Sequence, residues 1–276
     1  MTQQSTVDAY LDTHPDTKAV IEKVLLNAPD VTGDELIDKH LAPMMDGIFE
    51  LITEQIAPQN LSVQQAELYI KELSVFARYN AQFLRRAAAS VEGACFELAH
   101  EFRRNHLEEG GERGHIPAHY TLYSGALLAD LGLRVNGHVP APETLTLLTL
   151  HDLLVEGSSA STICGGYYAT EGVAINETVL LRSITDRYGE LTVGAPSAQL
   201  PALDYYYQLH LDEEHEAAAG DGLSVEAAHI EGIATFIRNR DLYHLDLPQI
   251  LDGFLQILEG MARWWGELTV RAHSLP

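Results

Sequence analysis

Apolar residues recur at intervals of three and four along most of this chain, the spacing that places them on one face of a helix. Segments with that spacing occupy residues 32–57, 61–109, 116–133, 141–157, 166–189, 201–219, 224–244 and 246–270. Thr32 and Glu35 have the spacing of a capping box, and Ser62 is the expected N-cap of the second segment. Gly93 is expected to divide that segment into two helices. No stretch alternates apolar and polar residues convincingly enough to predict a strand.

The connections between these segments are short, so the helices are expected to pack as a single body. The breaks fall at 58–62, 134–143 and 190–203, and none is long enough to separate two domains. We therefore predict one compact all-α domain over residues 31–276. Residues 1–30 show little periodicity and are expected to form an arm or a short surface helix outside the core.

The composition is that of an ordinary globular protein with a strong acidic bias. Of 276 residues, 46% are hydrophobic, and the mean hydropathy is -0.06. Asp and Glu number 40 against 17 Lys and Arg, so the net charge of -23 would repel a nucleic-acid backbone. No apolar run approaches the roughly 20 residues of a membrane span. The expected partner is therefore a small molecule, not nucleic acid or a membrane, and a homodimer is left open.

The two cysteines, Cys95 and Cys164, are too few for a disulfide framework, which suits a reducing compartment. The first residues also lack the basic and apolar regions of a secretory signal. A cytoplasmic location is therefore expected. Neither cysteine stands in a basic setting that would activate a thiol, so both are expected in the core.

Acidic residues and histidines gather in three places. Glu108 and His115 lie seven residues apart, which is about two helical turns. Glu171 stands in a largely apolar segment, where a lone buried carboxylate needs a cation or hydrogen bonds. Asp212 and His215 are at i and i+3 and can reach one point. Carboxylates with imidazoles suit iron or manganese, but each pair alone fits a solvated helix face better than a metal site.

The order of these elements resembles the haem-oxygenase-like di-iron oxidases, which include CADD-like proteins, UndA-like proteins and N-oxygenase domains. In that family a helix carries an Asn and one or more Glu, and a glycine break, a ligand His and a helix ending in Leu-Gly-Leu follow. The matching positions are Asn105, Glu108 or Glu109, Gly110, Gly111, His115 and 131–133. Glu171 matches the second ligand Glu, and "YYYQLHLDEEH" is similar to the family's His-x-x-x-Asp-x-x-His element. The resemblance covers residues 35–270 and implies a haem-oxygenase-like (TenA/PqqC-like) helical bundle.

Two ligand positions stay open at this point. Glu108 is in helical phase with His115, whereas Glu109 fits the family's Glu-x-Gly spacing. Gln208 occupies the position of the family's first His in the last element. His210 is the alternative ligand, and we favour it, although a π-bulge or a helix shift would have to bring it round.

The resemblance implies a non-haem di-iron oxidoreductase with dioxygen as co-substrate. Its two irons, with manganese as the alternative metal, would be held by residues drawn from Glu108, Glu109, His115, Glu171, His210, Asp212 and His215. The implied substrate is a small molecule, like an amino acid or a fatty acid, and the implied outcome is N-oxygenation, C–C cleavage or desaturation.

Two other interpretations are kept. One is a metal-free TenA- or PqqC-like protein that binds or hydrolyses a small ligand. The other is a ferritin-like di-iron bundle that pairs Glu97 and His100 with Asp212 and His215. The remaining histidines considered are expected at the surface or in structural roles: His106, His119, His138, His151 and His229.

Overall fold

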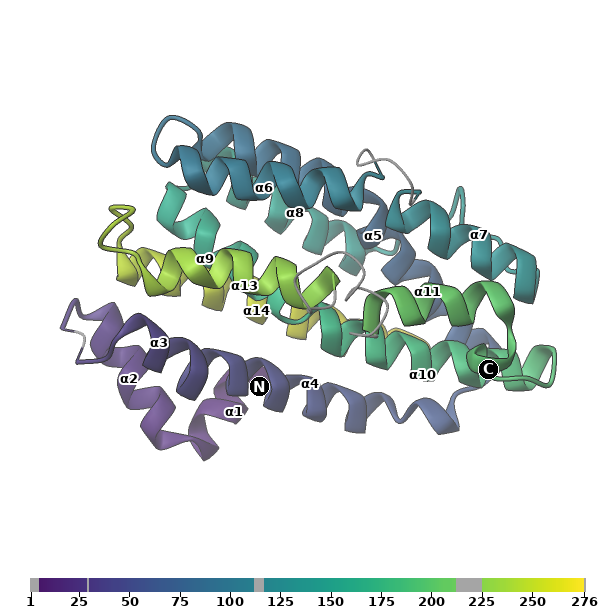
Figure 1. The fold of residues 1–276 in the computed structure, drawn as a ribbon. Helices are drawn as coiled ribbons and strands as arrows, with labels where there is room; N and C mark the ends of the chain where they lie inside the picture. The colour runs from purple at the N-terminus through teal and green to yellow at the C-terminus, as the bar shows by residue number, and fades with distance from the viewer. Residues whose placement is uncertain (1–4, 29, 112–116, 212–224, 276) are drawn as a thin grey trace.

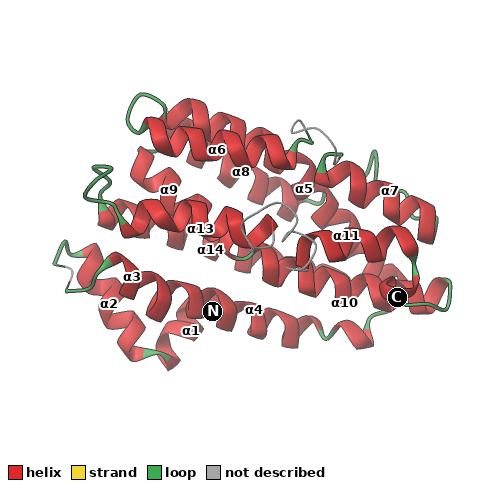
Figure 2. Ribbon diagram, in the orientation of Figure 1, coloured by secondary structure: helices red, strands yellow, loops and turns green. Residues whose placement is uncertain are grey.

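A computed structural model of the chain describes residues 5–28, 30–111, 117–211 and 225–275. Throughout these residues the chain forms helices, turns and loops, with no strand among them (Figure 2). The longer helices run roughly side by side along the length of the molecule (Figure 1). The predicted all-α class is therefore confirmed, and the described residues form one compact helical bundle.

The helices divide into an N-terminal and a C-terminal half of the sequence. The first half contains α1 (Thr6–Thr13), α2 (Pro15–Leu25), α3 (Gly33–Leu36), the π-helix η1 (Ile37–Leu41), α4 (Ala42–Ile56), the 3₁₀ turn η2 (Pro58–Asn60), α5 (Val63–Val91), α6 (Phe96–Glu109) and α7 (His119–Leu131). The second contains α8 (Pro142–Gly157), α9 (Ala160–Gly172), α10 (Ala174–Thr192), the 3₁₀ turn η3 (Ser197–Gln199), α11 (Pro201–Leu211), α13 (Val225–Arg238) and α14 (Leu247–His273).

Several helix boundaries follow the local signals in the sequence. The Thr32 side chain accepts a hydrogen bond from the backbone N–H of Glu35 at 3.2 Å, and the Glu35 carboxylate accepts one from the Thr32 N–H. Ser62 caps α5 in the same way, with Gln65 as its partner. The expected break at Gly93 is confirmed, because α5 and α6 are separate helices on either side of it.

Two glycines let α9 and α14 meet at the level of their backbones. A Cβ added at Gly165 would lie 1.8 Å from the carbonyl oxygen of Ile250. One added at Gly253 would lie 2.0 Å from the carbonyl oxygen of Thr162. Only glycine permits so close an approach of two main chains. The contact fixes α9 against the longest C-terminal helix and so fixes the position of Glu171 near the end of α9.

The predicted arm or short surface helix at residues 1–30 is, over its described part, the helix pair α1 and α2. Both helices contribute side chains to the core, namely Val7, Tyr10, Ile21 and Val24. The Tyr10 hydroxyl donates to the carbonyl oxygen of Pro43 at 3.2 Å and so ties α1 to α4. The pair is thus packed on the bundle, and the domain boundary at residue 30 stays a prediction.

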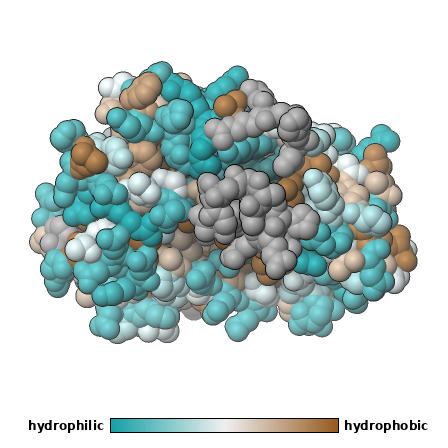
Figure 3. Space-filling model, viewed as in Figure 1, coloured by the Kyte–Doolittle hydropathy of each residue, from teal (hydrophilic) through white to brown (hydrophobic). Residues whose placement is uncertain are grey.

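The face of the molecule in Figure 3 is mostly hydrophilic, with apolar side chains scattered singly or in small groups. This agrees with the acidic composition of the chain. None of the described helices combines the length and the apolarity that a bilayer crossing requires.

His151 on α8 has the structural role expected of it. It is fully buried against Phe76 and Phe83, and its Nδ1 lies 3.0 Å from the Leu147 carbonyl oxygen. Burial lowers the pKa of His151 to about 4, from 6.5. The unfolded chain therefore binds this proton first as the pH falls. Between pH 6.5 and about pH 4, each unit by which the pH falls should therefore lower the free energy of unfolding by roughly 1.4 kcal/mol through His151 alone.

Urea unfolding between pH 7 and pH 4 tests this expectation. The variant His151→Leu should lose stability less steeply with falling pH than the natural protein. The exposed His273 on α14 provides the control, since His273→Leu should leave the slope unchanged. An identical slope in all three proteins would contradict the assignment.

Candidate metal centre

Carboxylates and imidazoles from five helices converge on one buried point of the bundle. Among the described residues the set comprises Glu109 on α6, His119 on α7, Glu171 on α9, His210 on α11, and Glu226 and His229 on α13. Hereafter we call these six side chains the cluster. Potential ligand atoms of His119, His210 and Glu226 all lie within 4.8 Å of one another. The same holds for Glu109, Glu171, Glu226 and His229, so Glu226 belongs to both groups.

The end of α6 and the start of α7 lie close together and bring two members of the cluster into contact. Glu109 is the last residue of α6, and Gly111 follows with a φ of 73°. A Cβ on Gly111 would lie 2.3 Å from the backbone nitrogen of Ala118, so this position requires glycine. This close approach of Gly111 to Ala118 places His119, the first residue of α7, beside the end of α6. His119 Nδ1 consequently lies 3.3 Å from Glu109 Oε1.

Glu226 and His229 share one face of α13 because they lie three positions apart along the helix. Both side chains are buried, and His229 has no exposed surface. His229 Nδ1 lies 3.4 Å from Glu171 Oε2 and 3.8 Å from Glu109 Oε1. One helix therefore carries a carboxylate and an imidazole into the space between α6 and α9.

Three buried atoms of the cluster have no hydrogen-bond partner among the described residues: Glu171 Oε1, His210 Nε2 and His229 Nδ1. The neighbouring nitrogen of His210, Nδ1, donates to the Tyr206 carbonyl oxygen at 2.7 Å, which leaves the lone pair on Nε2. An unsatisfied buried polar atom costs about 1–3 kcal/mol. A cation bound between these atoms would remove that cost, so the donor set fits a metal.

The carboxylates of the cluster are stabilised by positive charge. Burial opposes protonation of His119 and His229, but the neighbouring carboxylates outweigh it and raise the pKa of both, that of His229 well above its usual value. Burial raises the pKa of Glu226 to about 7, and the nearby Glu109 carboxylate adds to the shift. Burial also opposes ionisation of Glu109, but the adjacent imidazole of His119 outweighs it and lowers the pKa of Glu109 to about 2. Burial lowers the pKa of His210 to about 3, so this ring is neutral and available as a ligand.

Glu108 lies beside the cluster rather than in it. Its Oε2 accepts a hydrogen bond from His229 Nε2 at 2.8 Å and pairs with Arg104 Nη1 at 3.1 Å. A proton on Nε2 leaves Nδ1 of the same ring as the atom that faces Glu171. Histidine ligands of metals are commonly oriented by an outer carboxylate of this kind. Of the two open candidates, the structure thus places Glu109 in the cluster and Glu108 behind His229.

The other predicted site residues divide into two sets. Glu171 and His210 are members of the cluster. His115, Asp212 and His215 lie outside the described residues. Gln208 is half-buried, and its amide donates to Asp204 Oδ2 at 2.9 Å. His210 reaches the cluster from a helix that is α-helical from Pro201 to Leu211, without the π-bulge considered for it.

His119, Glu226 and His229 are members of the cluster that sequence reasoning missed. His119 and His229 were assigned surface or structural roles, but both are buried, with exposed fractions of 8% and 0%. The sequence did contain a signal for Glu226 and His229, because they have the same i, i+3 spacing as Asp212 and His215. The ferritin-like alternative has no support in the described residues, because its pair on α6, Glu97 and His100, is exposed.

A small cavity of about 90 Å³ adjoins the cluster. Five of its lining residues belong to the cluster, namely Glu109, His119, Glu171, His210 and Glu226. Apolar and aromatic side chains form other parts of its wall: Leu73, Phe76, Ala77, Ala174, Leu181, Tyr123 and Tyr206. A molecule in this cavity would touch the candidate ligands directly.

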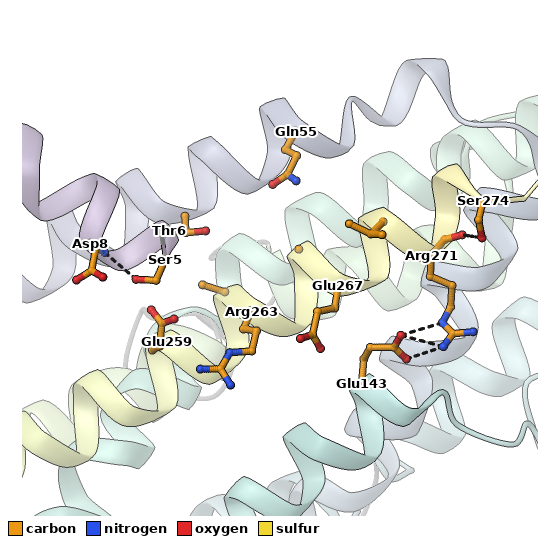
Figure 4. A pocket seen from close by; sticks show the side chains of 13 residues that line it. Ser5, Thr6, Asp8, Gln55, Glu143, Glu259, Arg263, Glu267, Arg271 and Ser274 are labelled. Atoms are coloured by element: carbon orange, nitrogen blue, oxygen red, sulfur yellow. Dashed lines mark hydrogen bonds and ion pairs between the residues drawn. The ribbon is translucent and has the colours of Figure 1, made fainter. Parts of the chain in front are cut away.

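A larger depression of about 850 Å³ lies among α1, α4, α8 and α14 (Figure 4). Of the residues that line it, Arg271 is paired with Glu143, and the Ser5 hydroxyl accepts a hydrogen bond from the backbone N–H of Asp8. No member of the cluster lines it. We therefore assign the candidate site to the smaller cavity beside the cluster.

Residues 36–271 match the model of a family described as a domain of unknown function with a solved structure, DUF3865. Two crystal structures of a CADD-like protein of unknown function from Nostoc punctiforme PCC 73102 are similar to the chain. Their TM-scores are 0.67 and 0.65 at 22% and 23% identity. Each covers 94% of this chain, and the match spans 100% and 97% of the other chain. These similarities show the fold. No curated protein matches the chain.

Proposed function

The chain belongs to the DUF3865 family, and we propose that its cluster holds two metal ions and makes it a non-haem di-metal oxidoreductase. The observation that carries the proposal is the shared position of Glu226 between two groups of candidate ligands. A carboxylate common to two adjacent sites can bridge two cations. Three carboxylates and three imidazoles form a donor set that suits iron or manganese.

The protein groups divide between two positions. His119, His210 and Glu226 would hold one ion, and Glu109, Glu171 and His229 would hold the other together with Glu226. The bound metals would supply the electrons for reaction with dioxygen. The chain orients two of the imidazoles, through the Tyr206 carbonyl behind His210 and Glu108 behind His229. Burial of the cluster restricts water and lets a small organic substrate lie beside it in the adjoining cavity.

The metal-free interpretation finds less support in the described residues. Hydrolysis by a thiol would need an accessible, activated cysteine. Cys95 and Cys164 are both buried, and burial raises the pKa of the Cys164 thiol. We therefore favour the metal-dependent function.

Metal analysis of the iron-reconstituted protein tests the proposal. We expect up to two irons per chain, a rise in melting temperature on loading, and consumption of oxygen by the ferrous protein. The thermal shift is expected because a ligand that binds only the folded state stabilises it. No more than trace iron, with manganese equally absent after reconstitution with Mn²⁺, would refute the proposal.

The position of Glu108 behind His229 leads to a separate prediction. Glu108→Gln should weaken metal binding by roughly 10- to 100-fold, the usual effect of losing an outer partner of a ligand histidine. Glu101 supplies a matched control, because it also pairs with Arg104 and lies one helical turn from that residue. Glu101→Gln should keep the affinity. Equal affinities of both variants and the natural protein, measured by competition with a chelator, would contradict the orienting role.

A further inference from the structure

Glu177 on α10 is a buried carboxyl group in the wall of the cavity, outside the cluster. It is 7% exposed and lies six residues after Glu171, across the junction of α9 and α10. Its Oε1 accepts a hydrogen bond from Trp265 Nε1 at 2.9 Å. Among the described residues, Oε2 has no donor and the carboxyl group has no cationic partner. A buried carboxylate normally has such a partner.

A second unsatisfied acceptor lies in the wall of the same cavity. The Oδ1 atom of Asn80 on α5 is buried and has no hydrogen-bond partner among the described residues. Two oxygen acceptors without donors therefore border one small space. Their natural complement is a group that donates several hydrogen bonds and accepts none, which describes a primary ammonium.

The charge of the surroundings favours a cation over an anion at this position. Burial raises the pKa of Glu177 to about 7, a shift that a bound ammonium would oppose. The chain as a whole carries a net charge of -23, which attracts cations and repels carboxylate-bearing ligands.

The remaining wall determines the rest of the ligand. Leu73, Phe76 and Leu181 offer apolar surface between the polar groups. The cavity volume of about 90 Å³ is smaller than the roughly 150 Å³ of a cavity that accommodates benzene. A short aliphatic chain fits these dimensions.

We propose that the substrate is a small aliphatic primary amine whose ammonium group binds between Glu177 and Asn80 while its carbon chain extends toward the cluster. This inference deepens the proposed function and rests on it only for the fate of the bound amine. Amine binding itself depends on Glu177 and Asn80, which are not members of the cluster.

Calorimetric titration of the metal-loaded protein with n-butylamine, butan-1-ol and butyrate tests the proposal. We expect n-butylamine to bind at least about 10-fold more tightly than either analogue, since a hydrogen bond to a charged group contributes that much. Glu177→Gln keeps an acceptor for Trp265 and should lose this preference while retaining its metal content. Asn80→Leu should weaken amine binding as well, and it serves as a second test if the first variant folds poorly.

The outcomes separate this inference from the proposed function. Preference for butyrate, or undiminished amine binding in both folded variants, would overturn the amine assignment even in a protein loaded with metal. A chain that binds n-butylamine through Glu177 but never takes up metal would retain the amine site and refute the di-metal function. As a control, Glu190→Gln on the exposed face of α10 should change neither property.

Discussion

Replacement of Glu226 by alanine is expected to remove metal from both positions of the cluster. Glu226 is the one described carboxylate that belongs to both groups of candidate ligands, so its loss takes a donor from each ion. It also leaves Glu109 and Glu171 as close carboxylates without the cations that would hold them together. Loss of a residue that only orients a metal ligand lowers metal affinity by up to roughly 100-fold. We expect Glu226→Ala to lower the metal affinity by more than this, because Glu226 is itself a candidate ligand.

Metal content after reconstitution and gel filtration measures this effect. Glu231 on the same helix provides the control, because it is exposed and pairs with Arg238. Glu231→Ala should bind as much metal as the natural protein. A Glu226→Ala variant that keeps full occupancy at both positions would show that the cluster is a buried polar network and would remove the basis for the di-metal function.

The pair Asp212 and His215 can be assessed in the same experiment. Both were predicted as ligands, and both lie outside the described residues. The double variant Glu226→Ala/His229→Ala is expected to lose all specific metal binding. A comparable loss in Asp212→Ala/His215→Ala would show that the predicted pair also contributes to the centre, whereas full retention would assign the last carboxylate–imidazole pair to α13.

The helices could be predicted from the sequence because their signals are local. Apolar spacing, the caps at Thr32 and Ser62 and the break at Gly93 each act within a few residues, and the structure confirms them. The close contact of α9 with α14 was not predicted. It depends on Gly165 and Gly253 lying opposite each other, a long-range relation that spacing along the chain does not reveal.

The cluster was only partly accessible to sequence reasoning for the same reason. Glu171 stood out because a carboxylate in an apolar segment needs a partner. His119 did not, because its place beside Glu109 depends on the turn at Gly111. His229 resembled an ordinary core histidine, since nothing local shows that its helix packs against α9. Its pairing with Glu226 was visible as a spacing, but the same spacing occurs at Asp212.

Alanine variants of His210 and Gln208 test which residue of α11 binds metal, and we expect their metal occupancies to differ sharply. His210 Nε2 is buried without a partner among the described residues and belongs to the group with His119 and Glu226. His210→Ala should therefore empty one of the two positions, and affinity there should fall at least about 100-fold, beyond the effect of an outer partner. The other position should remain loaded, because its four candidate ligands are unchanged.

Gln208→Ala is the matched control on the same helix, two residues away. Its amide is held by Asp204, and its side chain does not line the cavity beside the cluster, so occupancy should remain that of the natural protein. Gln208→His addresses the alternative in which this position replaces a missing ligand. If Gln208→His restored metal binding to the His210→Ala variant, α11 could present a ligand from either position. The hydrogen bond to the Tyr206 carbonyl would then not be the reason that His210 is the ligand. We expect no such rescue, because α11 is α-helical over both positions and two successive residues turn the side chain at position 208 about 160° away from that at position 210.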